Sequence, residues 1–386
     1  RPVRQVSLTG TDPAGSVRAG RLETTGSQSE SPPGRLLDSV LRMKRRRPRR
    51  PPPKRPAAAG PEQPTAAARA HGEKLLAALA MHEQGQLDQP EAICKEILQS
   101  EPQHFDALRM LATIAAQRKH AAVAVELFDQ VLKINPDHAP SLNHRGNALL
   151  DLKRHDEALE SYDRALRIEP DFAEAHYNLG VTYTALGRYK DAIESLKQAV
   201  NIKPDDAETH YGLGNACGGF GRYQDAAEAY MQAIRINPDY AEAHYNLGIA
   251  YSNLGRAQDA IESYKQAIRI KPDYARAHCN LGSAYGELGR YKDAAESYKL
   301  AIKIKPDYAE AYYNLGIAYG TLGRYQDEIK SYEQAIKINP DYAEAHFGLG
   351  NAYFFAGDKD SALKQYKSLK GLDARLAAEL HNLICK

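Results

Sequence analysis

Tryptophan is absent from this chain of 386 residues, and cysteine and methionine occur only four times each. The cysteines are separated by 62 positions or more; they are Cys94, Cys217, Cys279 and Cys385. Such spacing fits neither a disulfide framework nor a set of metal ligands. We therefore expect reduced thiols without a catalytic role, as in proteins of a reducing compartment.

Long hydrophobic runs are also missing. No stretch approaches the ~18–20 apolar residues needed to cross a bilayer, and the first residues lack the apolar segment of a secretory signal. We expect a soluble, cytoplasmic protein without membrane contact.

The motifs of common catalytic sites are absent as well. There is no Gly-x-Ser-x-Gly elbow and no His-Glu-x-x-His zinc motif. The glycines between Gly214 and Gly221 lack the Gly-Lys-Ser/Thr that would complete a phosphate-binding loop. The sequence thus predicts no enzyme, no catalytic residue, no bound metal and no cofactor.

Charge is divided unevenly along the chain. Of the 51 lysines and arginines, 15 lie in residues 1–70, with only 5 of the 49 acidic residues. Residues 71–386 hold the other 36 basic and 44 acidic residues, so a basic arm precedes an acidic body. Because residues 1–65 are rich in Pro, Gly, Ser, Thr and Arg, we expect them to be disordered.

The most basic stretch, Lys44 to Arg55, directly follows the first methionine, Met43. We therefore interpret residues 1–42 as an upstream stretch that is not normally translated. The simplest interpretation of the basic run is a solvated tail. The alternatives are nucleic-acid binding, nuclear targeting, docking on a proline-binding groove and docking back onto the acidic body. The run has no aromatic residue to stack on a base, which disfavours nucleic acid as a partner.

Proline, in contrast, recurs every 34 residues. The series is Pro102, Pro136, Pro170, Pro204, Pro238, Pro272, Pro306 and Pro340. A fixed period of this length predicts a solenoid, in which each unit stacks only on its neighbours. Function is then expected on the stacked surface rather than in an enclosed active site.

Residues 241–274 show how one unit folds. Four residues lie on one face of a first helix: His244, Leu247, Gly248 and Tyr251. Gly255 supplies the left-handed residue after that helix, and a second helix follows before Pro272. At the junctions we expect the Asp after each proline to cap the next helix, with a Glu three residues later, as in Asp239 and Glu242.

These residues resemble the tetratricopeptide repeat family, which places a large residue, Leu, Gly and Tyr at positions 4, 7, 8 and 11 of a 34-residue unit, then Ala, an aromatic, Ala and Pro at positions 20, 24, 27 and 32. Five repeats match nearly throughout: 173–206, 207–240, 241–274, 275–308 and 309–342. Repeats 139–172 and 343–376 match well, and repeats 71–104 and 105–138 are degenerate. Position 4 is His or Tyr, a departure from the family.

The resemblance implies an all-α, right-handed superhelical solenoid of about nine helix–turn–helix repeats. Its parts are two degenerate repeats over 71–138, seven regular repeats over 139–376 and a C-terminal capping helix over 373–386. The cap is expected from an apolar stripe formed by Leu372, Leu376, Leu380 and Leu383.

In this family, positions 2, 5, 6, 9, 12 and 13 of each first helix face a concave groove. Position 6 is asparagine in four repeats and position 9 in three: Asn178, Asn246, Asn280 and Asn314, and Asn147, Asn215 and Asn351. Position 5 is often tyrosine: Tyr177, Tyr211, Tyr245 and Tyr313. These residues are the predicted peptide-binding site; the alternative is that they only complete the stacking of repeats.

An inward row of asparagines is similar to the ladder in the superhelical half of O-linked N-acetylglucosamine transferases, and the repeats also resemble those of prokaryotic scaffold proteins. Helices pack about 8–10 Å apart and an extended chain advances about 3.3 Å per residue, so one carboxamide per repeat meets about every third peptide residue. A second row, at position 2, is acidic and favours basic ligands: Glu174, Glu208, Glu242, Glu310 and Glu344. Arg276 interrupts it.

The favoured function is a non-catalytic scaffold that binds an extended peptide or partner protein in the groove. The alternative is the substrate-recruiting portion of a glycosyltransferase whose catalytic domain is absent; the expected C-terminal cap argues against it. Nothing in the sequence indicates an oligomeric state.

Three irregular features add expectations. Five histidines at position 4 lie one or more repeats apart, too far to share a metal, and are expected to be structural: His176, His210, His244, His278 and His346. The glycines of repeat 207–240 indicate either a hinge or a drifting repeat. Glu328 replaces a small alanine, and we expect its carboxylate to tilt outward because burial is costly.

Overall fold

The computed structural model describes residues 66–385; residues 1–65 and Lys386 lie outside it. The chain divides into two units, residues 1–70 and 71–386, and the first is described only from Ala66, where a helix begins. The predictions about the arm, including the Lys44–Arg55 run, fall outside the described residues.

Nineteen helices and no strands make up residues 66–385. In chain order they are α1 (Ala66–Glu83), α2 (Asp88–Ser100), α3 (Phe105–Gln117), α4 (Ala121–Ile134), α5 (Ala139–Asp151), α6 (His155–Ile168), α7 (Ala173–Ala185), α8 (Tyr189–Ile202), α9 (Ala207–Gly219), α10 (Tyr223–Ile236), α11 (Ala241–Asn253), α12 (Ala257–Ile270), α13 (Ala275–Glu287), α14 (Tyr291–Ile304), α15 (Ala309–Thr321), α16 (Tyr325–Ile338), α17 (Ala343–Phe355), α18 (Lys359–Leu372) and α19 (Ala374–Ile384).

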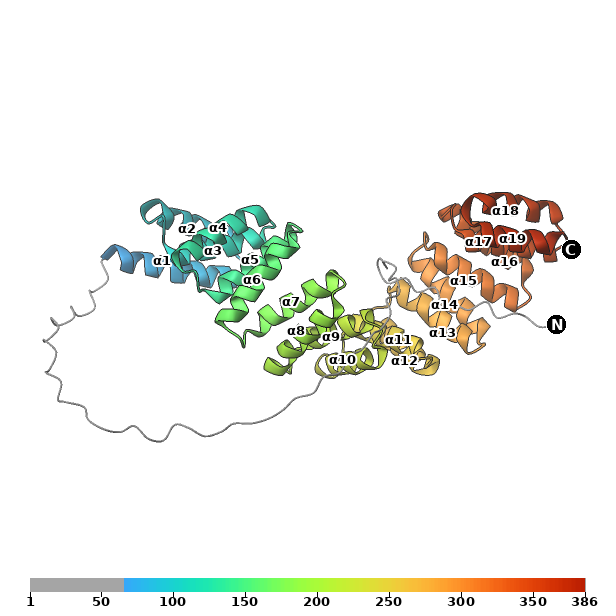
Figure 1. Ribbon diagram of the computed structural model, residues 1–386, viewed down its shortest axis with the longest axis horizontal. Coiled ribbons are helices and arrows are strands. Elements are labelled where there is room, and N and C mark those ends of the chain that lie inside the picture. The colour runs from blue at the N-terminus through green and yellow to red at the C-terminus, as the bar shows by residue number, and fades with distance from the viewer. Residues whose placement is uncertain (1–65, 386) are drawn as a thin grey trace, which may run out of the picture. The chain divides into compact units, whose positions relative to one another are not determined.

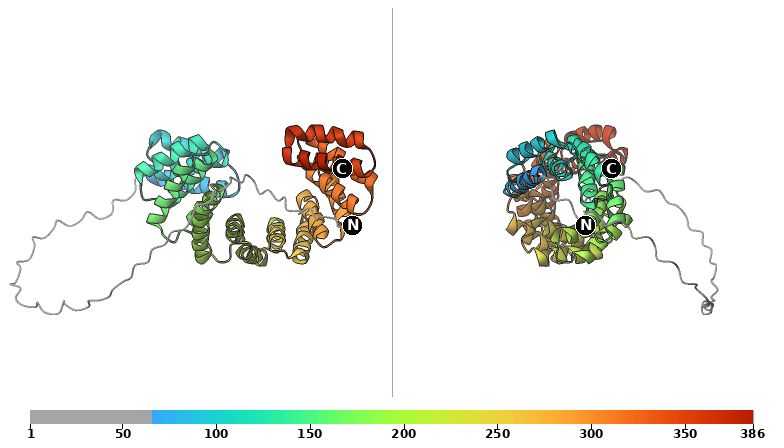
Figure 2. Two further views of the ribbon diagram at one scale, coloured as in Figure 1. Left: turned by 45° about the vertical axis from the view of Figure 1, so that its right-hand side comes forward. Right: turned by 90° about the vertical axis from the view of Figure 1, so that its left-hand side faces the viewer.

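The helices of the second unit follow one another in stacked pairs (Figures 1 and 2). From α3 to α18, each odd-numbered helix packs on the next even-numbered helix, which packs on the odd helix of the following repeat. Each odd helix from α3 to α15 also contacts the next odd helix, whereas within the described helices no two successive even helices pack extensively. The odd helices therefore form the inner, concave side of the array. The predicted all-α repeat solenoid is confirmed.

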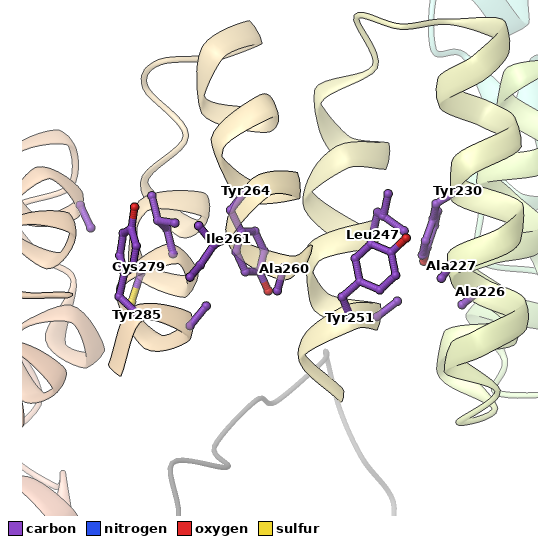
Figure 3. Packing of buried hydrophobic residues seen from close by; sticks show 14 of the residues in the cluster. Ala226, Ala227, Tyr230, Leu247, Tyr251, Ala260, Ile261, Tyr264, Cys279 and Tyr285 are labelled. Carbon is purple, nitrogen blue, oxygen red and sulfur yellow. The ribbon is translucent and has the colours of Figure 1, made fainter. Parts of the chain in front are cut away.

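Small residues let the two helices of a repeat approach closely. In repeat 241–274, a Cβ placed on Gly248 of α11 would lie 2.5 Å from the ring of Tyr264 on α12. Between repeats, Leu247 and Tyr251 of α11 face Tyr230 and alanines of α10 (Figure 3). Each unit therefore buries its apolar residues against both neighbours, as a solenoid requires.

A left-handed residue ends each first helix. Gly255 has φ +70°, as the sequence predicts, and the corresponding turns of the other repeats from 173 to 376 also use glycine. Lys119 and Lys153 take the same conformation, with φ 63° and 59°. A residue with a Cβ is strained there.

The predicted caps at the junctions are wrong. Helix α11 starts after Tyr240, whose side chain makes no cap hydrogen bond, and Asp239 lies one residue too early to act as the cap. In repeat 207–240 the cap is Asp206, the second residue after Pro204, which directly precedes α9 and accepts from the backbone N–H of Thr209. The sequence signal was ambiguous because, in each Pro-Asp-Tyr junction, the N-cap position can be either the Asp or the aromatic residue that follows it.

Position-4 histidines stabilise these junctions instead. In each case Nε2 contacts a proline carbonyl six residues earlier at 2.9–3.0 Å, as for His244 and Pro238. The five residues are His176, His210, His244, His278 and His346. Within residues 66–385 no group of three or more His, Cys, Asp or Glu side chains is placed to hold a metal ion.

The predicted capping helix is α19, which packs on α17 and α18. Its N-cap Asp373 accepts hydrogen bonds from the backbone of Arg375 and Leu376. Leu376 and Leu380 are buried, and a Cβ on Gly350 of α17 would lie 2.5 Å from Leu380. None of the described helices is long and apolar enough to cross a bilayer.

Candidate functional site

The odd helices leave the same positions accessible in repeat after repeat. In α11, the residues at positions 2, 5, 6, 9, 12 and 13 keep at least partial exposure: Glu242, Tyr245, Asn246, Ile249, Ser252 and Asn253. The same positions are accessible from α5 to α17, apart from the buried Asn143, Gly212, Cys279 and Gly286. We call this surface the odd-helix face.

The four position-6 asparagines are half-buried, and three of them donate to the preceding repeat. Asn246 Nδ2 donates both to Tyr211 Oη at 3.1 Å and to Asn215 Oδ1 at 2.9 Å. Asn280 Nδ2 donates to Tyr245 Oη at 3.2 Å. The carboxamides therefore link successive odd helices, and no hydrogen bond among residues 66–385 uses the Oδ1 of Asn246 or Asn280.

The other two position-6 asparagines vary this scheme. Asn178 Nδ2 donates to Asn143 Oδ1 at 2.9 Å. Asn314 is half-buried and lies beside the thiol of Cys279. The four predicted residues thus share one position on the odd-helix face, but each has a different partner in the repeat before it.

The position-9 asparagines make contacts within their own repeats. Asn147 Oδ1 accepts from Tyr162 Oη at 2.6 Å, and Asn215 Oδ1 accepts from Tyr230 Oη at 2.9 Å. With the bond from Asn246, Asn215 Oδ1 accepts twice. Asn351 Oδ1 is buried and has no partner within residues 66–385.

The position-5 tyrosines pack as well as face the inner side. The distances between ring centroids are 4.9 Å for Tyr211 and Tyr240, 4.8 Å for Tyr245 and Tyr274, and 5.1 Å for Tyr313 and Tyr342. Such distances are typical of favourable aromatic pairs. Burial raises the pKa of Tyr313 to about 12 and also raises the pKa values of Tyr177 and Tyr211.

Repeat 275–308 breaks the tyrosine row, because Cys279 takes position 5 and is fully buried. Glu310 of the next repeat lies close by; its pKa is raised by burial, with a hydrogen bond to Tyr308 and the nearby Arg276 opposing the shift. The sequence placed Glu310 in the accessible row of position-2 glutamates. The replacement of the position-5 tyrosine by Cys279 is the sequence signal that distinguishes Glu310 from the other members of that row.

The rest of the position-2 row is more accessible. Glu174, Glu208 and Glu344 are exposed and Glu242 is partly exposed, so these four carboxylates mark one edge of the odd-helix face. Arg276 is exposed and supplies the one positive charge in the row. The edge is therefore acidic with a basic break at α13.

The expectation for Glu328 is wrong. Its carboxylate lies against Gly320 of α15, since a Cβ on Gly320 would come within 2.6 Å of Glu328 Oε1. Burial raises the pKa of Glu328 to about 7. Gly320 has no side chain, so it leaves room for the Glu328 carboxylate between the two helices. The expectation considered only the alanine that Glu328 replaces.

Stacked helix pairs with one continuous inner face define a helical-repeat solenoid. Models of the tetratricopeptide repeat match residues 81–143, 297–330 and 344–372, and a TPR repeat model matches residues 321–357. The model of the cilia and flagella-associated protein 70 C-terminal domain matches residues 138–311. The chain belongs to the tetratricopeptide repeat family.

Solved structures similar to this chain include MamA, at 34% identity over 45% of this chain and 94% of MamA, with a TM-score of 0.42. YrrB, described as a TPR protein with an unusual peptide-binding site, is 25% identical over 48% of this chain and 96% of YrrB, with a TM-score of 0.44. A tetratricopeptide repeat protein from Parabacteroides merdae is 18% identical over 64% of this chain and 99% of its own length, with a TM-score of 0.50. No curated protein matches the chain.

Proposed function

We propose that this protein is a non-catalytic interaction scaffold whose odd-helix face holds an extended peptide or partner segment. Membership of the tetratricopeptide repeat family supports a role in protein interaction. The proposal goes further in three respects: the ligand is an extended peptide, the asparagines and tyrosines of the odd-helix face bind it, and basic ligands are preferred.

The observation that carries the proposal is the state of the Asn246 carboxamide. Both of its N–H groups are occupied within the array, by Tyr211 and Asn215. Its oxygen has no partner among the described residues, and the same holds for Asn178, Asn280 and Asn314. A half-buried carbonyl oxygen on an accessible face is an acceptor for the backbone N–H of a bound chain.

This arrangement reads the backbone more than the side chains of a ligand. Each such hydrogen bond contributes only about 0.5–1.5 kcal/mol net, so affinity needs several repeats acting together. Since every peptide has the same backbone N–H groups, specificity from these contacts alone is broad. The exposed Glu174, Glu208 and Glu344 add attraction for Lys and Arg side chains.

The test uses the full-length chain and a displayed library of random 15-residue peptides, with affinities of selected peptides measured by fluorescence anisotropy. The site variant is Asn246→Ala/Asn280→Ala/Asn314→Ala. The control variant is Gln224→Ala/Gln258→Ala/Gln326→Ala, which removes three exposed carboxamides from even helices. Thermal melting followed by circular dichroism sets a temperature at which all three proteins are folded.

We expect the site variant to bind on the order of 100-fold more weakly than wild type, the product of three lost hydrogen bonds of about 1 kcal/mol. The control variant should bind like wild type. Equal affinities for all three proteins would overturn the proposal.

A further inference from the structure

Position 9 of the odd helices alternates between polar and aliphatic residues. From α5 to α17 the series is Asn147, Val181, Asn215, Ile249, Ser283, Ile317 and Asn351. All seven side chains are at least partly accessible. Position 9 of the odd-helix face is therefore polar in one repeat and aliphatic in the next, with a period of two repeats.

Three of the four polar members of this series, Asn147, Asn215 and Ser283, make hydrogen bonds within their own repeats, whereas Asn351 Oδ1 has no partner within residues 66–385. Asn147 and Asn215 accept hydrogen bonds from Tyr162 and Tyr230 of their own repeats. The aliphatic members have no such partner: Val181 is 38% exposed, and Ile249 and Ile317 are partly buried against the core. Helices α7, α11 and α15 thus each present an apolar contact point.

Position 6 follows the same two-repeat period in α7, α9, α11, α15 and α17, whereas α13 carries Asn280 beside Ser283. Position 6 is glycine in α9 and α17, where position 9 is Asn, and asparagine in α7, α11 and α15, where position 9 is Val or Ile. An aliphatic side chain therefore stands beside a carboxamide in α7, α11 and α15. The pairing of an aliphatic side chain with a carboxamide therefore recurs every second repeat.

The spacing of these pairings defines a spacing in the ligand. Successive odd helices are in contact, and packed helices lie about 8–10 Å apart, so two repeats span about 16–20 Å. An extended chain covers this distance in about five to six residues at roughly 3.3 Å each, and a polyproline-type chain needs about the same number at roughly 3.1 Å each. Residues six apart point to the same side in both conformations, whereas in a β-strand residues five or seven apart point to opposite sides.

From this geometry we infer that the scaffold recognises extended basic segments that carry aliphatic side chains six residues apart. The inference rests on the proposed function. The aliphatic side chains contact Val181, Ile249 and Ile317, and the intervening backbone contacts the asparagine oxygens. Basic residues between them face the acidic edge formed by Glu174, Glu208 and Glu242.

The probes are three fluorescein-labelled peptides of identical composition, built from Lys, Ser and three Leu. The leucines are spaced by six residues in the first peptide, five in the second and seven in the third. Each is titrated with the full-length chain and followed by anisotropy. The six-residue peptide should bind at least roughly tenfold more tightly than the others, since partial burial of one leucine is worth about that factor.

Two variants of the chain copy residues that other repeats already carry at this position. Val181→Asn reproduces Asn147 and Asn215, and Ile249→Ser reproduces Ser283. Each should weaken the six-residue peptide roughly tenfold and remove its advantage. Leu300→Ser, at a 47% exposed leucine of the even helix α14, is the control and should leave binding unchanged.

Equal binding of the three peptides together with unchanged binding by Val181→Asn would overturn the inference. If the peptides are still weakened by Asn246→Ala/Asn280→Ala/Asn314→Ala, the proposed function stands without this spacing rule. If that variant has no effect either, both fail. Val181 is the safer of the two positions for folding because it is the more exposed.

Discussion

Gly214 of α9 lies directly beneath the ring of Tyr230 on α10, and a Cβ at Gly214 would come within 2.5 Å of that ring. Four residues later, Gly218 has no such neighbour, since its nearest contact would be Tyr230 Oη at 3.7 Å. The two glycines share a helix but differ in what they do. One is required by packing, and the other only lowers helix propensity.

Gly218→Ala should therefore stabilise the chain by about 0.5–1 kcal/mol, the usual gain of Ala over Gly in a helix. Gly214→Ala should destabilise it by about 1–3 kcal/mol, because the ring must move to admit a methyl group. Urea unfolding followed by circular dichroism measures both. Stabilisation by both substitutions would show that the ring contact imposes no constraint.

Hydrogen exchange in α9 no faster than in α11 would remove the hinge interpretation of repeat 207–240.

Glu328 should make stability depend on pH. Its folded pKa of about 7 exceeds the ordinary 4.5, so between these values the folded chain binds more protons than the unfolded chain, and stability falls as pH rises from about 4.5 to 7. Glu328→Ala should be more stable than wild type at pH 8 by about 1–2 kcal/mol, a value reduced for partial exposure. This advantage should shrink towards pH 5.

Thermal melting at pH 5 and pH 8 tests this dependence. Glu160→Ala, at an exposed carboxylate of α6, is the control and should show no such change. A Glu328→Ala advantage that is the same at both pH values would contradict the burial of this carboxylate.

Lys153 occupies a left-handed turn that glycine fills in the following repeats. Lys153→Gly should raise stability by up to about 1 kcal/mol, since the Cβ strain is removed even though glycine costs more backbone entropy. The midpoint of urea unfolding measures this change. Gly187→Lys in the next repeat, where φ is +72°, should have the opposite effect; stabilisation there would contradict the argument from strain.

Asn246 and Tyr211 should be energetically coupled across the repeat boundary. A double-mutant cycle with Asn246→Ala and Tyr211→Phe is expected to give a coupling of about 0.5–1.5 kcal/mol in unfolding free energy. The same cycle with Tyr313→Phe, two repeats away, should be additive within about 0.5 kcal/mol. Equal coupling in both cycles would mean that the hydrogen bond at 3.1 Å does not join these repeats.

Much of the fold follows from local sequence signals. The 34-residue proline period, the helix face that includes Leu247 and Gly248, and the turn at Gly255 each depend on residues close in sequence. The helix pairs and turns were therefore predictable from one repeat. The C-terminal cap was predictable too, because its apolar stripe had only the last repeat to cover.

The side-chain contacts were less predictable because they join residues on different helices, from 8 positions apart for Gly320 and Glu328 to 35 positions apart for Tyr211 and Asn246. Nothing local indicates that Asn246 donates to Tyr211 and Asn215, or that Glu328 lies against Gly320. The prediction of helix N-caps at the junctions between repeats failed for a different reason. The helix begins one residue later than expected, so Asp239 does not occupy the N-cap position. The peptide-binding role of the asparagine and tyrosine rows remains a prediction.

The most direct test of the central claim uses backbone methylation. A groove-binding peptide is compared with an analogue methylated on the backbone nitrogen at every third residue, by anisotropy with the full-length chain. If carbonyl oxygens of Asn246, Asn280 and Asn314 accept peptide N–H groups, methylation should weaken binding on the order of 100-fold. The Asn246→Ala/Asn280→Ala/Asn314→Ala variant should respond far less. Unchanged affinity after methylation in every register would contradict the account.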